Sequence, residues 1–195
     1  MAEGDQRLFI AVPLSDAAID ACRVLIDGVR AQTDPRGARW VRIDGLHVTL
    51  RFLGAAPSDV VPSIVEGMRT AAEGRPAFDI TLSGAGAFPE GRRPRALWLG
   101  IEHGADELAT LVRDLDEPLE RLGWATDARP FRPHLTVART DAVHGGGGLA
   151  VAEALTTAAS AWSVSFRAVS VCLFRSHLGT GAARYERMGE VGLEG

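Results

Sequence analysis

Residues 46–54 read LHVTLRFLG, and residues 134–139 read HLTVAR. Both stretches contain the pattern His-x-Thr-x, and both are rich in the β-branched and aliphatic residues that favour strands. Alternate side chains of a strand point to the same face, so His47 and Thr49 share one face of their strand. His134 and Thr136 share a face in the same way. The two stretches therefore predict two equivalent strands, each presenting a histidine and a threonine together.

An irregular lead-in precedes each motif, and an arginine follows it. The first lead-in reads WVRIDG (40–45) and the second reads RPFRP (129–133). A duplicated lobe that brings its two equivalent strands together accounts for this repetition. A single histidine in a strand is more often structural than catalytic. The joint pattern, however, indicates that His47 and His134 work as a pair, one as an acid and one as a base.

The rest of the chain alternates between helical and strand-like patterns. Hydrophobic periodicity predicts helices over 16–32, 59–73, 105–122 and 149–159, with Ser15 and Ser58 capping the first two. Strands are expected over 8–14, 48–53, 78–82, 96–101 and 184–191, with one or two more within 162–174. Gly54 is expected to end the first motif strand, and Gly145 to Gly148 to form a loop. This order predicts an α+β protein with two similar sheets and helices outside.

The composition narrows the class of protein. No run approaches the roughly 18 apolar residues of a membrane-spanning helix, and the polar N-terminus lacks a secretion signal, so a cytoplasmic protein is expected. Cys22 and Cys172 are expected to be buried free thiols. No metal-binding motif is present, so we expect a mechanism without metal or cofactor. His103 and His144 have no partner at a useful spacing and are expected in surface loops.

The charge is unevenly distributed along the chain. The net charge is -4, yet every basic residue is an arginine. Acidic residues concentrate in the predicted helix over 105–122, whereas arginines gather near the motifs and in one Pro/Gly-rich loop: Arg36, Arg39, Arg42, Arg92, Arg93, Arg95, Arg129, Arg132 and Arg139. A cationic cleft in an acidic protein favours a local phosphate ligand over a long duplex.

Four segments, in order, resemble the RNA 2′,3′-cyclic phosphodiesterase family, also called 2′-5′ RNA ligases, within the two-histidine phosphoesterases. They are RLFIAV (7–12), LHVTLRFLG (46–54), GAFP (86–89) with RPRALWLG (93–100), and RPFRPHLTVAR (129–139). The resemblance covers nearly the whole chain. It implies a single bilobal α+β domain over residues 1–195, in which two antiparallel sheets face each other across a central cleft.

The resemblance also implies an activity, which is metal-independent hydrolysis of RNA 2′,3′-cyclic phosphate ends to 2′-phosphates. By analogy with the family, His47 is assigned as the acid and His134 as the base. Thr49 and Thr136 are expected to donate hydrogen bonds to the non-bridging phosphate oxygens, where negative charge builds up. One departure from the family lies near the C-terminus, where the segment from Thr180 to Tyr185 lacks a usual proline.

Phe52 and Arg139 each lie five residues past a motif histidine, and both are expected to contact the nucleotide. Aromatic rings and guanidinium groups stack on bases of any identity. Strict strand alternation would point both side chains away from the histidine face, so this role requires each strand to twist or end first. Trp40 and Trp98 are expected in the core.

Other functions remain compatible with the same motifs. A 2′-5′ RNA ligase would use the same chemistry, and so would a phosphodiesterase acting on a small cyclic phosphate such as ADP-ribose 1″,2″-cyclic phosphate. A nucleotide-binding module without turnover belongs to a different class. The expected partners are RNA ends or cyclic nucleotides, with no membrane. The oligomeric state is open, and a monomer is the default expectation.

Overall fold

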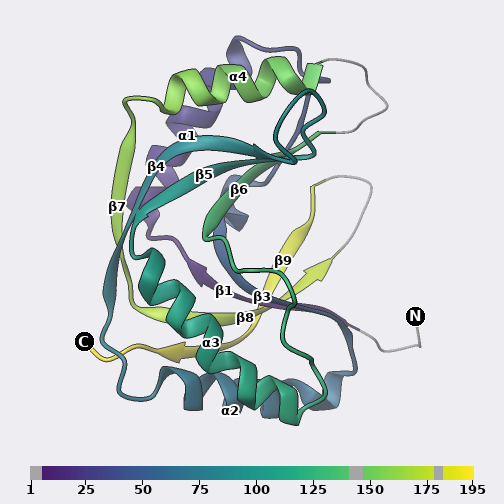
Figure 1. Cartoon of the computed structure of the whole chain (residues 1–195), viewed down its shortest axis with the longest axis vertical. Coiled ribbons are helices and arrows are strands. Elements are labelled where there is room, and N and C mark those ends of the chain that lie inside the picture. The colour runs from purple at the N-terminus through teal and green to yellow at the C-terminus, as the bar shows by residue number, and fades with distance from the viewer. Residues whose placement is uncertain (1–5, 141–146, 178–181) are drawn as a thin grey trace.

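The structure is a computed structural model that describes residues 6–140, 147–177 and 182–195. Strands and helices alternate along the chain (Figure 1). The strands are β1 (Gln6–Pro13), β2 (Arg39–Trp40), β3 (His47–Ala56), β4 (Phe78–Phe88), β5 (Ala96–His103), β6 (His134–Arg139), β7 (Ser163–Ala168), β8 (Ser170–His177) and β9 (Arg184–Gly192). The helices are α1 (Asp16–Ala31), α2 (Val61–Ala72), α3 (Ala105–Arg121) and α4 (Gly147–Ala159), with short 3-10 turns η1 (Ile43–Gly45) and η2 (Ser58–Val60).

The strands form two antiparallel sheets. Sheet A has the order β3-β1-β8-β9, and sheet B has the order β2-β6-β5-β4-β7. In sheet A the motif strand β3 pairs with β1, and in sheet B the motif strand β6 pairs with β5, and two further strands follow in each sheet. Strand β6 also pairs with the short edge strand β2. Helices α2 and α3 cover the outer face of sheet A, and α1 and α4 cover that of sheet B (Figure 1). The predicted α+β class with two similar sheets is confirmed.

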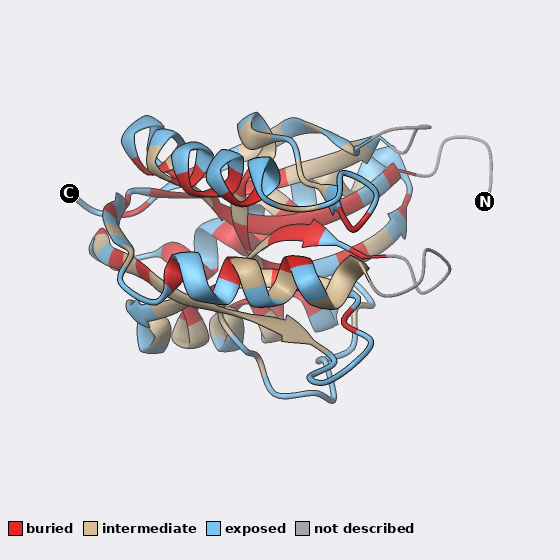
Figure 2. Ribbon diagram, turned by 90° about the horizontal axis from the view of Figure 1, so that it is seen from above, coloured by how far each residue is buried: buried red, intermediate tan, exposed pale blue. Residues whose placement is uncertain are grey.

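The core lies between each sheet and its helices. On β3, Val48 and Leu50 are buried, and on β5, Leu97 and Leu99 are buried. Figure 2 shows buried residues along the inner strands and exposed residues on the outer sides of the helices. Each sheet therefore uses one face for its core, because burying aliphatic side chains against helices is the main source of stability. The other face of each sheet is left free of helices.

Two predicted element boundaries were wrong, and for one physical reason. The prediction ends strands at Leu82 and Gly54, but β4 continues to Phe88 and β3 to Ala56. Gly84 and Gly54 have φ values of +65° and +74°, and each lies at an irregularity in the strand pairing. A glycine with positive φ absorbs a β-bulge, so the strand bends and continues instead of ending.

The helix starts differ in two places. Ser15 caps α1 as predicted, since its hydroxyl accepts a hydrogen bond from the Ala18 amide at 3.3 Å. Ser58 does not cap α2, because a 3-10 turn intervenes and α2 begins three residues later. Gly147 and Gly148 belong to the first turn of α4, contrary to the predicted loop. Gly147 packs against Gly37, where any side chain would collide with the neighbouring backbone.

The sequence also predicts the positions of the two cysteines and of two further histidines. Cys22 and Cys172 are free and buried, as expected. His103 ends strand β5 with its side chain exposed, instead of lying in a loop. His144 lies outside the described residues. Among the described residues, no helix is long and apolar enough to cross a membrane.

Candidate active site

The two motif strands lie against each other. β3 is the edge strand of sheet A, β6 is the second strand of sheet B, and the two strands are in contact. On β3, His47 and Thr49 are half-buried on the helix-free face, while the alternating residues Val48 and Leu50 point into the core. On β6, His134 and Thr136 repeat this pattern. The expectation that the two motif strands come together is confirmed.

The helix-free faces of the two sheets are turned toward each other (Figure 1). Had these faces packed against each other, their side chains would be buried. Instead, the histidines and threonines of both motifs are partly exposed, and Phe52 is 68% exposed. Solvent therefore reaches the space between the sheets, which we call the inter-sheet groove.

Both motif strands carry a β-bulge at the same position. In β3, Leu50 has no partner in β1, because the pairing passes from Thr49 directly to Arg51. The fourth residue of the second motif, Val137, is likewise skipped in the pairing of β6 with β5. A bulge places two consecutive residues on one face, and Leu50 and Arg51 are accordingly both buried. The alternation after the bulge is reversed.

The bulges bring the fifth residue after each histidine onto the histidine face. Phe52 lies opposite Phe9, its ring centroid 6.1 Å away, and the Phe9 ring in turn lies 4.6 Å from His47. Arg139 is exposed and interacts electrostatically with Tyr185 of the opposite sheet. Strict alternation would have hidden both side chains behind the groove. The structure thus provides the twist that their predicted nucleotide contact requires, while the contact itself remains a prediction.

The two histidines are held in the same way by the backbone. His47 Nδ1 lies 2.7 Å from the carbonyl oxygen of Gly45, and His134 Nδ1 lies 2.6 Å from that of Arg132. A carbonyl oxygen only accepts, so Nδ1 carries the proton in both rings. In the neutral ring Nε2 then holds the free lone pair, and in the charged ring Nε2 donates. Each lead-in thereby fixes both the tautomer and the ring orientation.

His47 lies among aromatic rings of sheet A. Its centroid is 4.6 Å from that of Phe9, 6.0 Å from Phe174 and 5.0 Å from Tyr185. Burial in this apolar setting disfavours the charged imidazolium and lowers the pKa of His47 to about 4, although the Gly45 carbonyl acts in the opposite direction. His47 is therefore neutral near pH 7 in the free protein.

His134 lies beside different aromatic rings. The Phe88 ring lies edge-on at 5.2 Å, and the Trp98 ring lies at 6.4 Å. Trp98 is half-buried beside the histidine, so the expectation that it belongs to the core is wrong. The Trp98 ring occupies the space above Gly86 on the neighbouring strand, where a Cβ would lie 2.3 Å from the nearest ring carbon. Trp40, by contrast, packs partly buried against the core as expected.

The arginines near the motifs are less available to bind a phosphate than the sequence suggests. Arg51 is buried and forms an ion pair with Asp116 of α3 at 2.9 Å. Three of the predicted cationic residues form ion pairs with an aspartate two residues away: Arg36 with Asp34, Arg42 with Asp44, and Arg129 with Asp127. These local carboxylates offset part of the charge. Arg139 lies on the groove face of β6, and Arg39 is its direct partner on β2.

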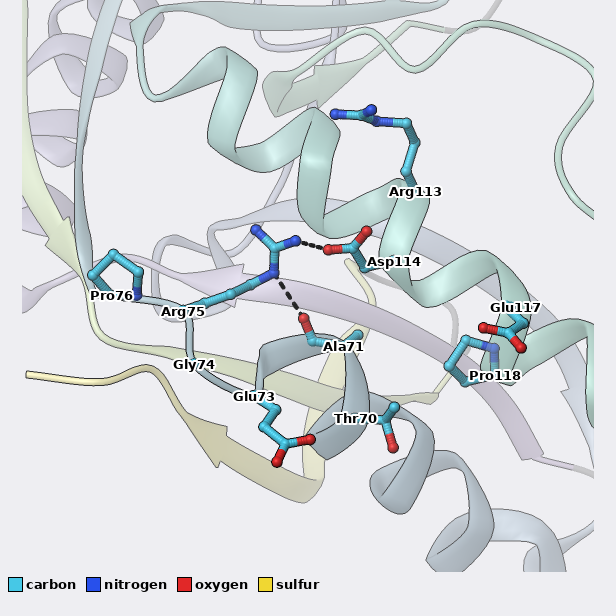
Figure 3. Close-up of a pocket in the computed structure, with 10 residues that line it drawn as sticks. All are labelled: Thr70, Ala71, Glu73, Gly74, Arg75, Pro76, Arg113, Asp114, Glu117 and Pro118. Atoms are coloured by element: carbon cyan, nitrogen blue, oxygen red, sulfur yellow. Dashed lines mark hydrogen bonds and ion pairs between the residues drawn. The ribbon is translucent and has the colours of Figure 1, made fainter.

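A cavity of about 560 Å³ lies elsewhere, between α2 and α3 (Figure 3). One pair of its charged side chains, Arg75 and Asp114, forms an ion pair. Arg75 donates to the Ala71 carbonyl at 2.8 Å and forms an ion pair with Asp114, so it joins the two helices. This cavity contains neither motif, and its mixture of acidic and basic groups selects no ligand. Among the described residues, no three His, Cys, Asp or Glu side chains gather in a way that could hold a metal ion.

Sequence reasoning missed the aromatic residues around the histidines. Phe9 comes from the first strand and Phe174 and Tyr185 from the last two, and the three rings meet through the pairing β1-β8-β9. Tyr185 is the one tyrosine of the sequence, which is the signal that could have drawn attention to it. Part of the segment before it, residues 178–181, lies outside the described residues, including the first two residues of the stretch that departs from the family pattern.

Comparison with known sequences finds similar proteins. The sequence pattern of the 2′-5′ RNA ligase superfamily matches residues 12–180. An RNA 2′,3′-cyclic phosphodiesterase of Geobacillus stearothermophilus is 37% identical over 131 residues, which cover 67% of this chain and 41% of that protein. One of Aeropyrum pernix is 37% identical, and 56% of its length is covered. The chain thus spans about half the length of these two relatives. One of Escherichia coli K12 is 30% identical, with 92% of each chain covered.

Solved structures are similar over nearly the whole chain. The structure of E. coli LigT complexed with 3′-AMP has a TM-score of 0.70 and 27% sequence identity, and 97% of this chain and 98% of that chain are covered. The structure of a Thermus thermophilus protein, TT0787, has a TM-score of 0.75 and 26% identity, with the same coverage. The two-sheet arrangement is therefore shared with these proteins.

Proposed function

Because the chain belongs to the 2′-5′ RNA ligase superfamily, we propose that it hydrolyses 2′,3′-cyclic phosphate ends of RNA to 2′-phosphates. The observation that carries this proposal is the pairing of two equal units. Each unit is a motif strand with a half-buried histidine, a threonine on the same face, a bulge after it and a backbone carbonyl on Nδ1. Such a pair suits a reaction that needs one proton acceptor and one proton donor.

The reaction moves two protons around one phosphorus atom. A base takes a proton from water, whose oxygen forms a new bond to phosphorus. The bond from phosphorus to the 3′ oxygen breaks, and an acid protonates that oxygen as it leaves. The phosphate stays on the 2′ oxygen. In the proposed roles, Nε2 of one histidine accepts while Nε2 of the other donates, since Nδ1 of both is already engaged.

We assign His47 as the base and His134 as the acid, which reverses the roles taken from the family resemblance. Burial keeps His47 neutral near pH 7, because its pKa is lowered to about 4. A neutral imidazole with its proton on Nδ1 presents a lone pair on Nε2, as a base requires. One member of the pair must be charged when the other is neutral, so the acid role falls to His134.

The other motif residues would act on the phosphate and the base. Thr49 and Thr136 lie on the same faces as the histidines and would donate to the non-bridging oxygens. Loss of one such donor typically costs about 2.7–4 kcal/mol of transition-state stabilisation, a 10²- to 10³-fold slower reaction. Phe52 would stack on a nucleobase, and Arg139 would stack or pair with the nucleotide.

The test is turnover of 2′,3′-cyclic AMP and of an oligoribonucleotide with a cyclic end. We expect hydrolysis by the wild type and at least a 10²-fold loss in His47→Ala and in His134→Ala, since positioned acids and bases contribute about 10²- to 10⁴-fold. His103→Ala is the matched control, because that histidine is exposed at the end of β5 and should leave the rate unchanged. Retention of more than a tenth of the rate in either motif variant contradicts the assignment.

The product and the metal requirement provide two further checks. Phosphorus NMR should show a 2′-phosphate, and a 3′-phosphate would reverse the proposed leaving group. EDTA should leave the rate unchanged; inhibition that a divalent ion restores contradicts acid–base catalysis by histidines alone. Binding of 2′,3′-cyclic AMP without turnover would indicate a nucleotide-binding module. Faster turnover of ADP-ribose 1″,2″-cyclic phosphate than of the cyclic-ended oligoribonucleotide would indicate a small-molecule phosphodiesterase.

A further inference from the structure

We infer that Tyr185 is a positioning residue that holds His47, through direct ring contact and through Gly45, in the orientation that proton transfer requires. The inference deepens the proposed function, on which it rests. Tyr185 lies on β9, the last strand of sheet A, and His47 lies on β3 at the opposite edge of the same sheet. The two residues are far apart in the chain, and the fold brings them into contact.

The Tyr185 ring contacts His47 on one side. The ring centroids are 5.0 Å apart and the rings stand at 87°, which is a favourable edge-to-face geometry. Phe9 closes the arrangement, since its ring lies 4.6 Å from His47 and 5.1 Å from Tyr185. The imidazole is thus enclosed by two rings set at different angles. A ring enclosed in this way loses the freedom to rotate about its side-chain bonds.

Tyr185 also lies directly on Gly45, the residue whose carbonyl binds His47. A Cβ on Gly45 would lie 2.9 Å from Cδ2 of Tyr185 and 3.1 Å from Cε2, so only glycine leaves room for the ring. The Gly45 carbonyl oxygen accepts the hydrogen bond from His47 Nδ1 at 2.7 Å. Tyr185 therefore contacts both the imidazole and the peptide segment that fixes its tautomer. A change in the Tyr185 ring should disturb both.

The second motif has no matching contact among the described residues. His134 is held by the Arg132 carbonyl, but its ring neighbours are Phe88 and Trp98 from strands β4 and β5. The contact between Tyr185 and Gly45 therefore belongs to the first motif alone. Both histidines have the backbone hydrogen bond, but His47 also has the Tyr185 ring beside it, and this ring makes its surroundings more apolar.

Charged and titratable groups also lie on the elements around His47, although its pKa responds to burial and to the Gly45 carbonyl. The lead-in carries the Arg42–Asp44 ion pair at 2.7 Å, and β6 on the facing sheet carries His134 and Arg139. Burial raises the pKa of the Tyr185 phenol, so the phenol is neutral near pH 7, and Arg139 acts in the opposite direction. The Tyr185 ring consequently acts on His47 by excluding water and by contact, not by charge.

The experiment compares Tyr185→Phe with Tyr185→Leu. Phenylalanine keeps the ring, so kcat for 2′,3′-cyclic AMP should stay within about threefold of the wild type. Leucine removes it, so kcat should fall by about 10- to 10²-fold with little change in KM, in line with the cost of misplacing a reacting group. NMR titration of the His47 ring should show its pKa rising toward 6.5 in Tyr185→Leu and staying low in Tyr185→Phe. Circular dichroism should show both variants folded.

A double-mutant cycle makes the test specific to the contact. Gly45→Ala alone should reduce kcat, because the new methyl group collides with the Tyr185 ring. In the Tyr185→Leu background, the same substitution should cost at least threefold less, since the ring is gone. Equal costs in both backgrounds, or a His47 pKa unchanged in Tyr185→Leu, would overturn the inference. The NMR titration needs no turnover, so it decides the inference even if the proposed hydrolysis fails.

Discussion

At the scale of single residues, the two histidines of this protein differ in their surroundings more than in their sequence motifs. Both have Nδ1 bound to a carbonyl two residues earlier. His47 additionally lies among Phe9, Phe174 and Tyr185, and burial lowers its pKa. Identical motifs can thus carry different roles, because the roles depend on the protonation state that the surroundings favour.

The dependence of kcat/KM on pH should reveal these roles. If His47 is the base, its protonation lowers kcat/KM on the acid side, with a midpoint well below 6.5 and near 4 in the free protein. The residual activity of His47→Ala should lack this acid limb, and that of His134→Ala should lack the alkaline limb. The measurement is kcat/KM for 2′,3′-cyclic AMP between about pH 3 and about pH 9, so that the acid limb is covered on both sides of its midpoint. Loss of the acid limb in His134→Ala instead would restore the roles implied by the family resemblance.

The sequence alone could identify the motif residues but not their differences. The His-x-Thr-x motif, which occurs twice, identifies His47, Thr49, His134 and Thr136. Strand alternation then places the histidine and the threonine of each motif on one face. The protonation state of His47 could not be predicted, because it depends on rings from strands that are distant in sequence. The prediction that Trp98 lies in the core is wrong for a similar reason, because the sequence alone does not distinguish a tryptophan beside His134 from a tryptophan of the core.

At the scale of elements, the matched bulges decide which side chains line the groove. Alternation predicts that Phe52 points away from His47, and the bulge at Leu50 reverses this. Bulges are poorly visible in sequence, because the extra residue is an ordinary aliphatic one. The glycines at 54 and 84 resemble strand ends in sequence for a related reason: positive φ serves both a turn and a bulge.

Phe52→Ala should therefore weaken substrate binding more than chemistry. Stacking of a base on an aromatic ring contributes about 1–3 kcal/mol, so KM for 2′,3′-cyclic AMP should rise roughly 5- to 150-fold while kcat changes less. Stability should hardly change, because the ring is 68% exposed. Val24→Ala is the control, since Val24 is 75% exposed on a helix away from the groove. An unchanged KM would leave Phe52 without a role in nucleotide binding.

Arg51 anchors the first motif strand to α3 and should matter for stability. Its side chain is 6% exposed and pairs with Asp116, which is 22% exposed. Arg51→Ala leaves that carboxylate without its partner and should lower the free energy of unfolding by about 3–5 kcal/mol. Urea unfolding measures this loss. Arg51→Met combined with Asp116→Leu should recover most of it, whereas Arg69→Ala, at an exposed pair with Glu66, should cost under about 1 kcal/mol.

At the scale of the whole molecule, the low pKa of His47 links stability to pH. The unfolded chain binds a proton at His47 near pH 6.5, and the folded protein binds it only near 4. His47 therefore costs no stability above pH 6.5, where the ring is neutral in both states, and the folded state loses stability as the pH falls from 6.5 toward 4. At about 1.4 kcal/mol for each pH unit between 6.5 and 4, this loss is at most about 3.5 kcal/mol, and less because the ring is partly exposed.

The comparison of wild type with His47→Gln should isolate this contribution. Glutamine does not titrate, so the free energy of unfolding of the wild type should fall more steeply between pH 6.5 and pH 4 than that of the variant. Urea unfolding at several pH values measures both slopes. His103→Gln serves as the control, since that exposed histidine should leave the slope as in the wild type. Equal slopes for wild type and His47→Gln would mean that folding leaves the proton affinity of His47 unchanged.

The different ring neighbours of the two histidines have a consequence for the direction of catalysis. Two identical lobes would give both imidazoles the same intrinsic proton affinity, and the orientation of the substrate alone would select the donor. In this chain, Phe9, Phe174 and Tyr185 surround one imidazole, and Phe88 and Trp98 lie beside the other. The surroundings of the two imidazoles thus already differ in the free protein. Under the proposed roles, a substrate bound in the reverse orientation would place its attacking water beside the proton donor instead of the acceptor, so this asymmetry would select one binding direction.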